Sequence, residues 1–478
     1  MRYQNLPNEL LSEIIEHILP DDIVAFSATD KRTWALAAAR LAEHQVLKAQ
    51  YSKVVFDNEF DVEGSISHPV RLLHAIWNNP RIASYVRHIV FICSDNYATH
   101  DFSFEPSNVD QSTWETIKQL DGCQELLRIN PYFKQNADDL RKCRVDILSG
   151  KQTAAFILLL VSLPSLRRLR YARAQDSDMD LLSSIFTSSA ASRIGSRVLS
   201  KLETVETYHL DSEGRTWINM LLLFAELPSV RTLKGAHIGW SEDIDSIPGW
   251  KGHISHLQKL ELSAGTIEPE DMESMLLPLQ GLTEFRYHHA CCGSTFEAQI
   301  FVDVLATTMG DQLEVLSLTN DEEDSDMTTR IASFKAFKVI QYPACQMIPA
   351  NTCIKVLKRL EISTQALTGD ENDDTAAPRL VDLLPPTIES VTLLSNQRER
   401  QPLCQDLQVQ LLLRDIISDK QECVPNLATL VLYNVPDAQY VATLRDVGIA
   451  VERMDTGSLP EHAKFWYDDP PIGDMPSI

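Results

Sequence analysis

The sequence predicts a mixed α/β protein, with a short all-helical module at the N-terminus and a long series of strand–helix repeats behind it. Apolar residues recur at helical spacing before residue 35, short phrases of alternating apolar residues follow along most of the chain, and amphipathic helix patterns separate those phrases. One repeat cannot bury its own apolar face. We therefore expect the repeats to stack as an irregular horseshoe solenoid, with parallel strands on the concave face and helices on the convex face.

The bulk composition limits the class of protein. The chain has 478 residues, a hydrophobic fraction of 44% and a net charge of −24. That hydrophobic fraction supports a packed core, and the length exceeds what one compact core usually holds. Because the net negative charge repels phosphate backbones and anionic lipid, we expect no nucleic acid and no membrane as a partner through a broad surface, while a local basic patch remains compatible with this charge.

Several absences in the sequence indicate an intracellular protein. The N-terminus lacks the cationic and apolar stretches of a signal peptide, and the longest apolar run, 154–161, is too short to span a bilayer. The nine cysteines are scattered and do not suggest a disulfide framework. We expect the protein in the cytoplasm, the nucleus or both.

The N-terminal module, residues 1–50, is predicted to hold short helices followed by a longer one. Pro7 suits the first turn of a helix, and Pro20 ends that helix before Asp21 and Asp22 start the next one. Apolar side chains cover more than one side of these short helices, so they must contact the rest of the chain, a partner or both. They are Leu10, Leu11, Ile14, Ile15, Ile18, Ile23, Phe26 and Trp34.

The pattern Leu6-Pro7-x-Glu9-Leu10-(x)3-Ile14-(x)3-Ile18-(x)4-Ile23 resembles an F-box. The chain departs from that family at Asp30-Lys31-Arg32-Thr33, where Cys-Lys-Arg-Trp is common, and Trp34 follows one position late. The resemblance implies binding to the Skp-type adaptor of SCF cullin–RING ubiquitin ligases. It places the adaptor contacts at Leu6, Pro7, Leu10, Ile14, Ile18, Ile23, Phe26 and Trp34. The alternative is an ordinary helical cap on the body of the chain.

The body is predicted as a degenerate repeat over residues 85–455, with 51–84 as a connector and 456–478 as an acidic, proline-rich tail. Phrases such as LPSLRRLRY from Leu163 fit Leu-x-x-Leu-x-Leu or a near variant. The predicted strands centre on Leu169, Tyr208, Leu233, Leu260, Phe285, Leu316, Ile340, Leu360, Val391 and Leu430, with an earlier strand at 85–91. Most steps between these anchors lie in or near the period of about 20–29 residues found in leucine-rich repeats.

The body therefore resembles the leucine-rich-repeat bodies of F-box proteins, particularly divergent fungal ones. Helical patterns such as 409–417 lie between the strands, and 444–454 is typical of a last helix and strand. The alternative is a doubly wound α/β domain. It is disfavoured because the chain lacks a glycine-rich first turn and long buried strands.

A basic set of residues is predicted on the concave face of the repeats. Positions that flank the anchors should point out of the core by the period-2 alternation of a strand. Six of these positions are Lys or Arg, which favours a target that is acidic or phosphorylated. They are Arg168, Arg170, Lys234, Lys259, Arg286 and Arg359. The alternative is that these are ordinary solvated polar positions, among which His209, Glu261, Glu284, His288 and Glu361 also fall.

The sequence predicts no catalytic residue, metal site or cofactor. The GKQT phrase at 150–153 has Val145 where a phosphate loop needs a glycine. Some histidines and cysteines could bind a metal ion, but their spacing lacks the paired cysteines of a zinc site. These residues are His253, His256, His288, His289, Cys291 and Cys292. The acidic runs 321–326 and 369–374 are typical of solvated loops.

Two functions of different classes remain open. One is a substrate receptor of a ubiquitin ligase, in which the F-box binds the adaptor and the repeats bind a target protein. The other is an interaction scaffold that works independently of any ligase. A catalytic insert in a repeat protein is a third, minor alternative.

Overall fold

The computed structural model describes the chain in separate ranges. These are 6–57, 69–92, 115, 136–149, 152–172, 181–182, 184–186, 199–208, 216–239, 255–267, 269–289, 298–320, 354–368, 379–394, 409–410, 412–432, 436 and 438–454. Within them the protein is mixed α/β, as predicted, and twelve strands make up its main sheet. The chain divides into two compact units, Met1–Glu206 and Thr207–Ile478, which are described in turn.

Three helices form the N-terminal module: α1 (Asn8–His17), α2 (Ile23–Ser27) and α3 (Lys31–Tyr51). The side chain of Asp30 caps α3 by accepting hydrogen bonds from the Thr33 backbone N–H at 2.8 Å and from the Thr33 hydroxyl at 2.9 Å. Arg32 then ties α3 to the start of α1, because its Nε lies 2.6 Å from Asn8 Oδ1 and its Nη2 lies 2.7 Å from the Leu6 carbonyl oxygen. The stretch 30–33, where the chain departs from the F-box pattern, therefore supplies the hydrogen bonds that cap α3 and join it to the start of α1.

The first unit continues with a parallel array of strands. Its elements are β1 (Lys53–Asp57), α4 (Pro69–Asn78), the 3-10 helix η2 (Pro80–Ser84), β2 (His88–Ile92), α8 (Ala137–Leu148), α9 (Gln152–Val161) and β3 (Arg168–Ala172). Strand β2 pairs in parallel with β1 on one side and with β3 on the other. The strand series thus begins at Lys53 within the expected connector, which also contains α4 and η2.

Helix α9 packs on one face of this array. The ring of Phe156 stacks on Phe91 of β2 at 4.4 Å between centroids, and it lies 6.5 Å from Tyr171 of β3. Val54, Ile89 and Leu169 are also buried, and the alternation along each strand places them on this core face. The opposite face carries Lys53, His88 and Arg168.

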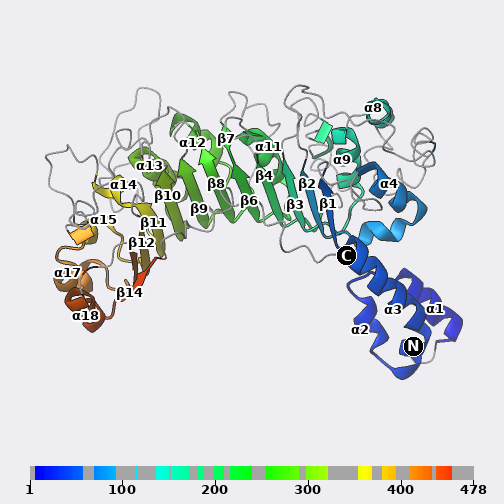
Figure 1. Ribbon diagram of the computed structural model, residues 1–478, viewed down its shortest axis with the longest axis horizontal. Helices are drawn as coiled ribbons and strands as arrows, with labels where there is room; N and C mark the ends of the chain where they lie inside the picture. The colour runs from blue at the N-terminus through cyan, green and yellow to red at the C-terminus, as the bar shows by residue number, and fades with distance from the viewer. Residues whose placement is uncertain are drawn as a thin grey trace. The chain divides into compact units, whose positions relative to one another are not determined.

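Strand β4 (Thr204–Tyr208) lies at the boundary between the units, and the second unit repeats the strand–helix pattern (Figure 1). Its strands are β5 (Thr216–Trp217), β6 (Thr232–Ala236), β7 (Ile238–Gly239), β8 (Lys259–Gly265), β9 (Glu284–His289), β10 (Val315–Asn320), β11 (Arg359–Ser363), β12 (Ser390–Leu394), β13 (Thr429–Leu432) and β14 (Ala450–Arg453). Its helices are α11 (Ile218–Leu222), η6 (Leu223–Glu226), α12 (Pro269–Leu276), α13 (Ala298–Met309), α14 (Thr364–Thr368), α15 (Leu380–Leu383), α17 (Ile416–Cys423) and α18 (Ala438–Asp446).

The main sheet of this unit runs β6-β8-β9-β10-β11-β12-β13-β14, while β5 and β7 form a separate pair. The predicted anchors align as direct neighbours across it. Their row is Leu233, Leu260, Phe285, Leu316, Leu360, Val391 and Leu430, all buried. On the same face, Tyr287 of β9 stacks on Phe301 of α13 at 4.8 Å, so helices cover the anchor side of the sheet.

Most predicted strands therefore lie where the alternation placed them, and α18 and β14 are the last helix and strand among the described residues. The predicted strand at Ile340, the acidic runs 321–326 and 369–374, and the tail 456–478 lie outside the described residues.

Candidate functional site

Apolar side chains of the N-terminal module remain in contact with solvent. On α1, Leu10 is 46% exposed and Ile14, one turn later, is 38% exposed; Trp34 at the start of α3 is 52% exposed. Three further exposed apolar residues of the module were not predicted as contacts: Leu19, Val24 and Val46. Exposed large apolar residues on so small a module are typical of an interaction surface.

The other predicted adaptor residues differ in accessibility. Ile23 is only 1% exposed, so it packs inside the module and is not available at the surface in this structure. Leu6, Ile18 and Phe26 are half-buried, and Pro7 is exposed at the N-cap of α1. Leu10, Ile14 and Trp34 are therefore the most accessible of the predicted large apolar contacts.

Asp21 joins the module to the strands of the first unit. Its Oδ1 lies 2.6 Å from Arg87 Nη2, and its Oδ2 lies 3.4 Å from Lys201 Nζ and 3.9 Å from Arg167 Nη2. Desolvation acts to raise the pKa of Asp21, but the positive charges of Arg87, Lys201 and Arg167 outweigh it and lower the pKa below its ordinary value. The ionised carboxylate is thus held where the strands β2, β3 and β4 begin.

Other polar contacts support the same junction. Arg81 Nη2 donates to the Glu16 carbonyl oxygen at 3.0 Å, and Arg81 Nη1 lies 3.4 Å from Glu43 Oε2. The buried imidazole of His44 on α3 lies 3.2 Å from the Tyr85 hydroxyl. Burial lowers the pKa of His44, which favours the neutral ring at this contact.

In the second unit, predicted substrate-binding cations are engaged with carboxylates of neighbouring strands. Lys234 Nζ on β6 lies 3.4 Å from Glu261 Oε2 on β8. Lys259 Nζ on β8 lies 3.2 Å from the same oxygen and 2.7 Å from Glu284 Oε1 on β9. These contacts follow the register, because Lys234 is the direct neighbour of Glu261 and Lys259 that of Glu284.

Arg286 on β9 completes this ion-pair chain. Its Nε lies 2.6 Å from Glu284 Oε1, and its Nη1 lies 2.5 Å from Glu361 Oε2 on β11. Desolvation opposes the charge of Arg286, yet Glu361 and Glu284 raise its pKa above the ordinary value. Hydrogen bonds from Lys259 and Arg286 likewise lower the pKa of Glu284 against the effect of its burial.

The chain of Lys234, Lys259 and Arg286 with Glu261, Glu284 and Glu361 therefore balances three cations with three carboxylates. Arg359, the remaining predicted residue of this unit, is exposed between the uncharged neighbours Val315 and Ser390. The basic excess expected from sequence is largely cancelled here, because the partner carboxylates lie on the same face.

The first unit differs in this respect. Lys53, His88 and Arg168 are direct neighbours across β1, β2 and β3. Desolvation, followed by the charges of Lys53, Arg168 and Arg170, lowers the pKa of His88 to about 4. Lys53, Arg168 and Arg170 therefore all act electrostatically on the His88 ring and disfavour its protonated form.

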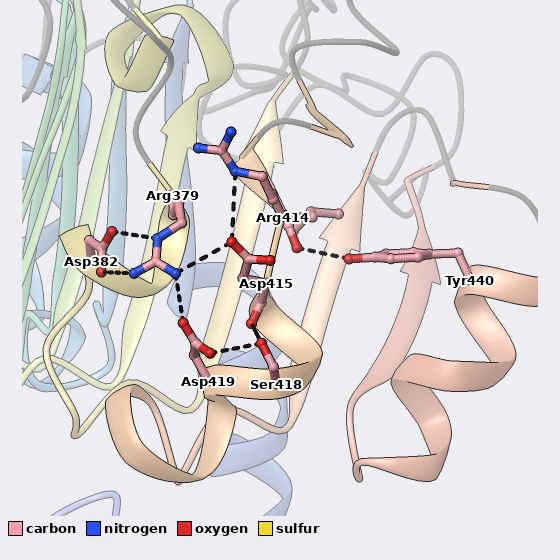
Figure 2. A network of polar contacts seen from close by, with 8 residues as sticks. Arg379, Asp382, Arg414, Asp415, Ser418, Asp419 and Tyr440 are labelled. Carbon is pink, nitrogen blue, oxygen red and sulfur yellow. Dashed lines mark hydrogen bonds and ion pairs between the residues drawn. The ribbon is translucent and has the colours of Figure 1, made fainter.

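A separate polar network fixes the helices near the end of the second unit (Figure 2). Arg379 binds Asp382 through two hydrogen bonds, Nε to Oδ2 at 2.7 Å and Nη2 to Oδ1 at 2.8 Å, and its Nη1 reaches Asp419 Oδ2 at 2.7 Å. The same Nη1 lies 3.4 Å from Asp415 Oδ2; Asp415 is the N-cap residue before α17 and has a left-handed φ of 63°. Sequence reasoning did not predict this network, which ties α15 to α17.

Within the described ranges, no group of three or more His, Cys, Asp and Glu side chains is placed to hold a metal ion. His288 instead contacts the Thr319 hydroxyl at 2.8 Å, and His289 contacts the Tyr287 hydroxyl at 2.9 Å. His209, His253, Cys291 and Cys292 lie outside those ranges.

The helices that the structure describes include none with the length and apolar character needed to cross a bilayer. The chain matches no protein-family model and no curated protein sequence.

Proposed function

We propose that this protein is the substrate-receptor subunit of an SCF-type cullin–RING ubiquitin ligase. In this proposal the N-terminal module is an F-box that binds a Skp-type adaptor, and the strand–helix repeats form a leucine-rich-repeat horseshoe that binds a target protein on its concave face. The protein itself would be non-catalytic and would need no cofactor.

The observation that carries the proposal is the exposure of Leu10 and Ile14 on α1. Both belong to the pattern that resembles an F-box, and both are left for a partner after Leu11 and Ile15 have filled the inside of the module. Burying two such side chains against an adaptor would contribute about 1.5–3 kcal/mol each.

The ion pairs of Asp21 suit this function because they resist rotation of the module relative to the first strands. A receptor accelerates ubiquitin transfer by raising the effective concentration of its target and by orienting it near the ubiquitin-loaded enzyme. A firmly held junction would preserve that orientation.

Co-purification with a Skp-type adaptor tests the proposal. The wild type should bind, and Leu10→Asp combined with Ile14→Asp should abolish binding without unfolding the chain, because both side chains are exposed. Val46→Asp is the matched control, since Val46 is 63% exposed on α3 but lies outside the F-box pattern. Failure of the folded wild type to bind any such adaptor would contradict the proposal and favour the ligase-independent scaffold.

The scaffold alternative predicts a different outcome in cells. A scaffold would retain its partners after the Leu10→Asp and Ile14→Asp exchange, and the abundance of those partners would not change. A substrate receptor would also retain them, but they would accumulate because they are no longer ubiquitinated.

A further inference from the structure

We propose that Lys53, His88 and Arg168 form a binding site for a phosphate monoester on the target protein. This inference rests on the proposed function, because it assigns the phosphorylated class of target to a particular part of the strand array. It also changes the expectation from sequence, in which the basic residues of both units contributed alike.

The first argument is the register of the strands. Lys53 pairs with His88 and His88 pairs with Arg168, so the three residues occupy one row across β1, β2 and β3. Neighbouring strands lie about 4.8 Å apart, so the outer Cα atoms are about 10 Å apart. Long Lys and Arg side chains at the two ends can reach an anion held above the central histidine.

The second argument is charge. Among the residues that the structure describes, no carboxylate forms an ion pair with Lys53 or Arg168, although both are exposed. The adjacent Arg167, by contrast, lies 3.9 Å from both Asp21 and Glu203. The row therefore combines two uncompensated cations with an imidazole that can gain a third charge.

The ion-pair chain of the second unit provides an internal comparison. There, each of Lys234, Lys259 and Arg286 has a carboxylate within 3.4 Å. A ligand phosphate would have to displace those carboxylates and leave partly buried charges without partners, which is costly. The row in the first unit needs no such exchange.

The third argument concerns His88 itself. Its ring is half-buried and forms no hydrogen bond with another described residue. In the free protein it is neutral at pH 7, since its pKa is about 4. A bound dianion would offset the repulsion from Lys53 and Arg168, raise the pKa of His88 and accept a hydrogen bond from its ring.

These groups fit a phosphate monoester better than a single carboxylate. At pH 7 a phosphate monoester carries about −1.5 to −2 charges and three acceptor oxygens, which match one ammonium, one guanidinium and one imidazole. The guanidinium of Arg168 can donate two parallel hydrogen bonds, whereas Lys53 acts as a point charge.

The binding experiment uses the full-length protein and three randomised peptide libraries that differ at one fixed residue: phosphoserine, serine or aspartate. We expect retention of the phosphoserine library only, with competition by inorganic phosphate. Arg168→Glu and Lys53→Glu should each weaken retention about tenfold or more, because each exchange removes a charged hydrogen-bond donor and introduces a carboxylate that repels the phosphate. Arg168→Lys should weaken it less.

Arg359→Glu is the matched control. Arg359 precedes its buried anchor Leu360 as Arg168 precedes Leu169, and the exchange changes the net charge equally. Equal losses for Arg359→Glu and Arg168→Glu would show general charge attraction and overturn the site. Equal retention of the phosphoserine and serine libraries, or of the phosphoserine and aspartate libraries, would overturn the phosphate assignment.

Nuclear magnetic resonance of histidine-labelled protein gives a second readout. Inorganic phosphate should shift the His88 ring resonances, assigned with a His88→Gln variant, toward the protonated form. No shift at saturating phosphate would contradict the proposal. Adaptor co-purification on the same variants separates the two hypotheses, because Arg168→Glu should leave adaptor binding intact whether or not phosphate binds.

Discussion

Arg286 on β9 and Glu361 on β11 form an ion pair across an intervening strand. Their Nη1 and Oε2 atoms lie 2.5 Å apart, although β10 separates the two strands. The direct neighbour between them on β10 is Ser317, a small residue that lets the arginine cross. Both charged side chains are mostly shielded from solvent, at 18% and 23% exposed, so their attraction is weakly screened.

A double-mutant cycle should measure this attraction. We expect Arg286→Met and Glu361→Gln to show a coupling free energy of about 1–2 kcal/mol in urea unfolding, because each single change leaves a partly buried charge without its partner. The pair of Lys358 and Glu314 is a control, since both side chains are more than 40% exposed and should show almost no coupling. Equal coupling for the two pairs would contradict the role of burial.

Glu226 should make the protein less stable as the pH rises. It is 8% exposed, its Oε1 has no hydrogen-bond partner in the described residues, and burial raises its pKa to about 7. The folded state therefore holds the proton more tightly than the unfolded state does, so stability falls between about pH 4.5 and pH 7. Glu226→Gln should remove this loss and raise the free energy of unfolding by about 2 kcal/mol more at pH 8 than at pH 5.

The control for this experiment is Glu422→Gln, which changes an exposed carboxylate on α17. It should change the free energy of unfolding little, because its side chain is exposed. A Glu226→Gln variant that behaved in the same way would show that the carboxyl of Glu226 is charged and solvated in the folded protein.

Asp21 should control the attachment of the N-terminal module. Asp21→Asn removes the charge that Arg87, Lys201 and Arg167 share, so we expect faster hydrogen exchange in α1 and α2. Since the pKa of Asp21 is lowered, its contribution is complete above its ordinary value near 3.8 and is lost as the pH falls through the lower folded-state value. The adjacent Asp22 forms no ion pair with the described residues, and Asp22→Asn should leave exchange unchanged.

The core of the strand array was predictable because its signal is local. Leu260, Phe285 and Leu316 each stand in the middle of a short alternating phrase, and the structure buries all three as neighbours in register. Strand β1 was missed although Val54 and Phe56 alternate in the same way. It directly follows the long helix α3 and lies in the stretch 51–84, which was predicted as a connector.

The charged face was less predictable because its outcome depends on register. The sequence places Arg286 and Glu361 on the same face but does not specify that they meet, 75 residues apart and across a strand. The burial of Ile23 was also not predictable from sequence. Helical spacing places this apolar residue on a helix, but only the packing of α1, α2 and α3 decides that it lies inside the module.

The large sequence separation between Asp21 and its cationic partners has a consequence for protein synthesis. Lys201, one of its three cationic partners, follows it by 180 residues. At a translation rate of about 5–20 residues per second, the ribosome needs about 9–36 s to make that stretch. Early in this interval, before Arg81 and Arg87 have been made, the new module depends on its internal bonds, such as those of Asp30 with Thr33 and of Arg32 with Asn8. The nascent chain thus exposes Leu10 and Ile14 to the cell before Lys201, the last of the cationic partners of Asp21, has been synthesised.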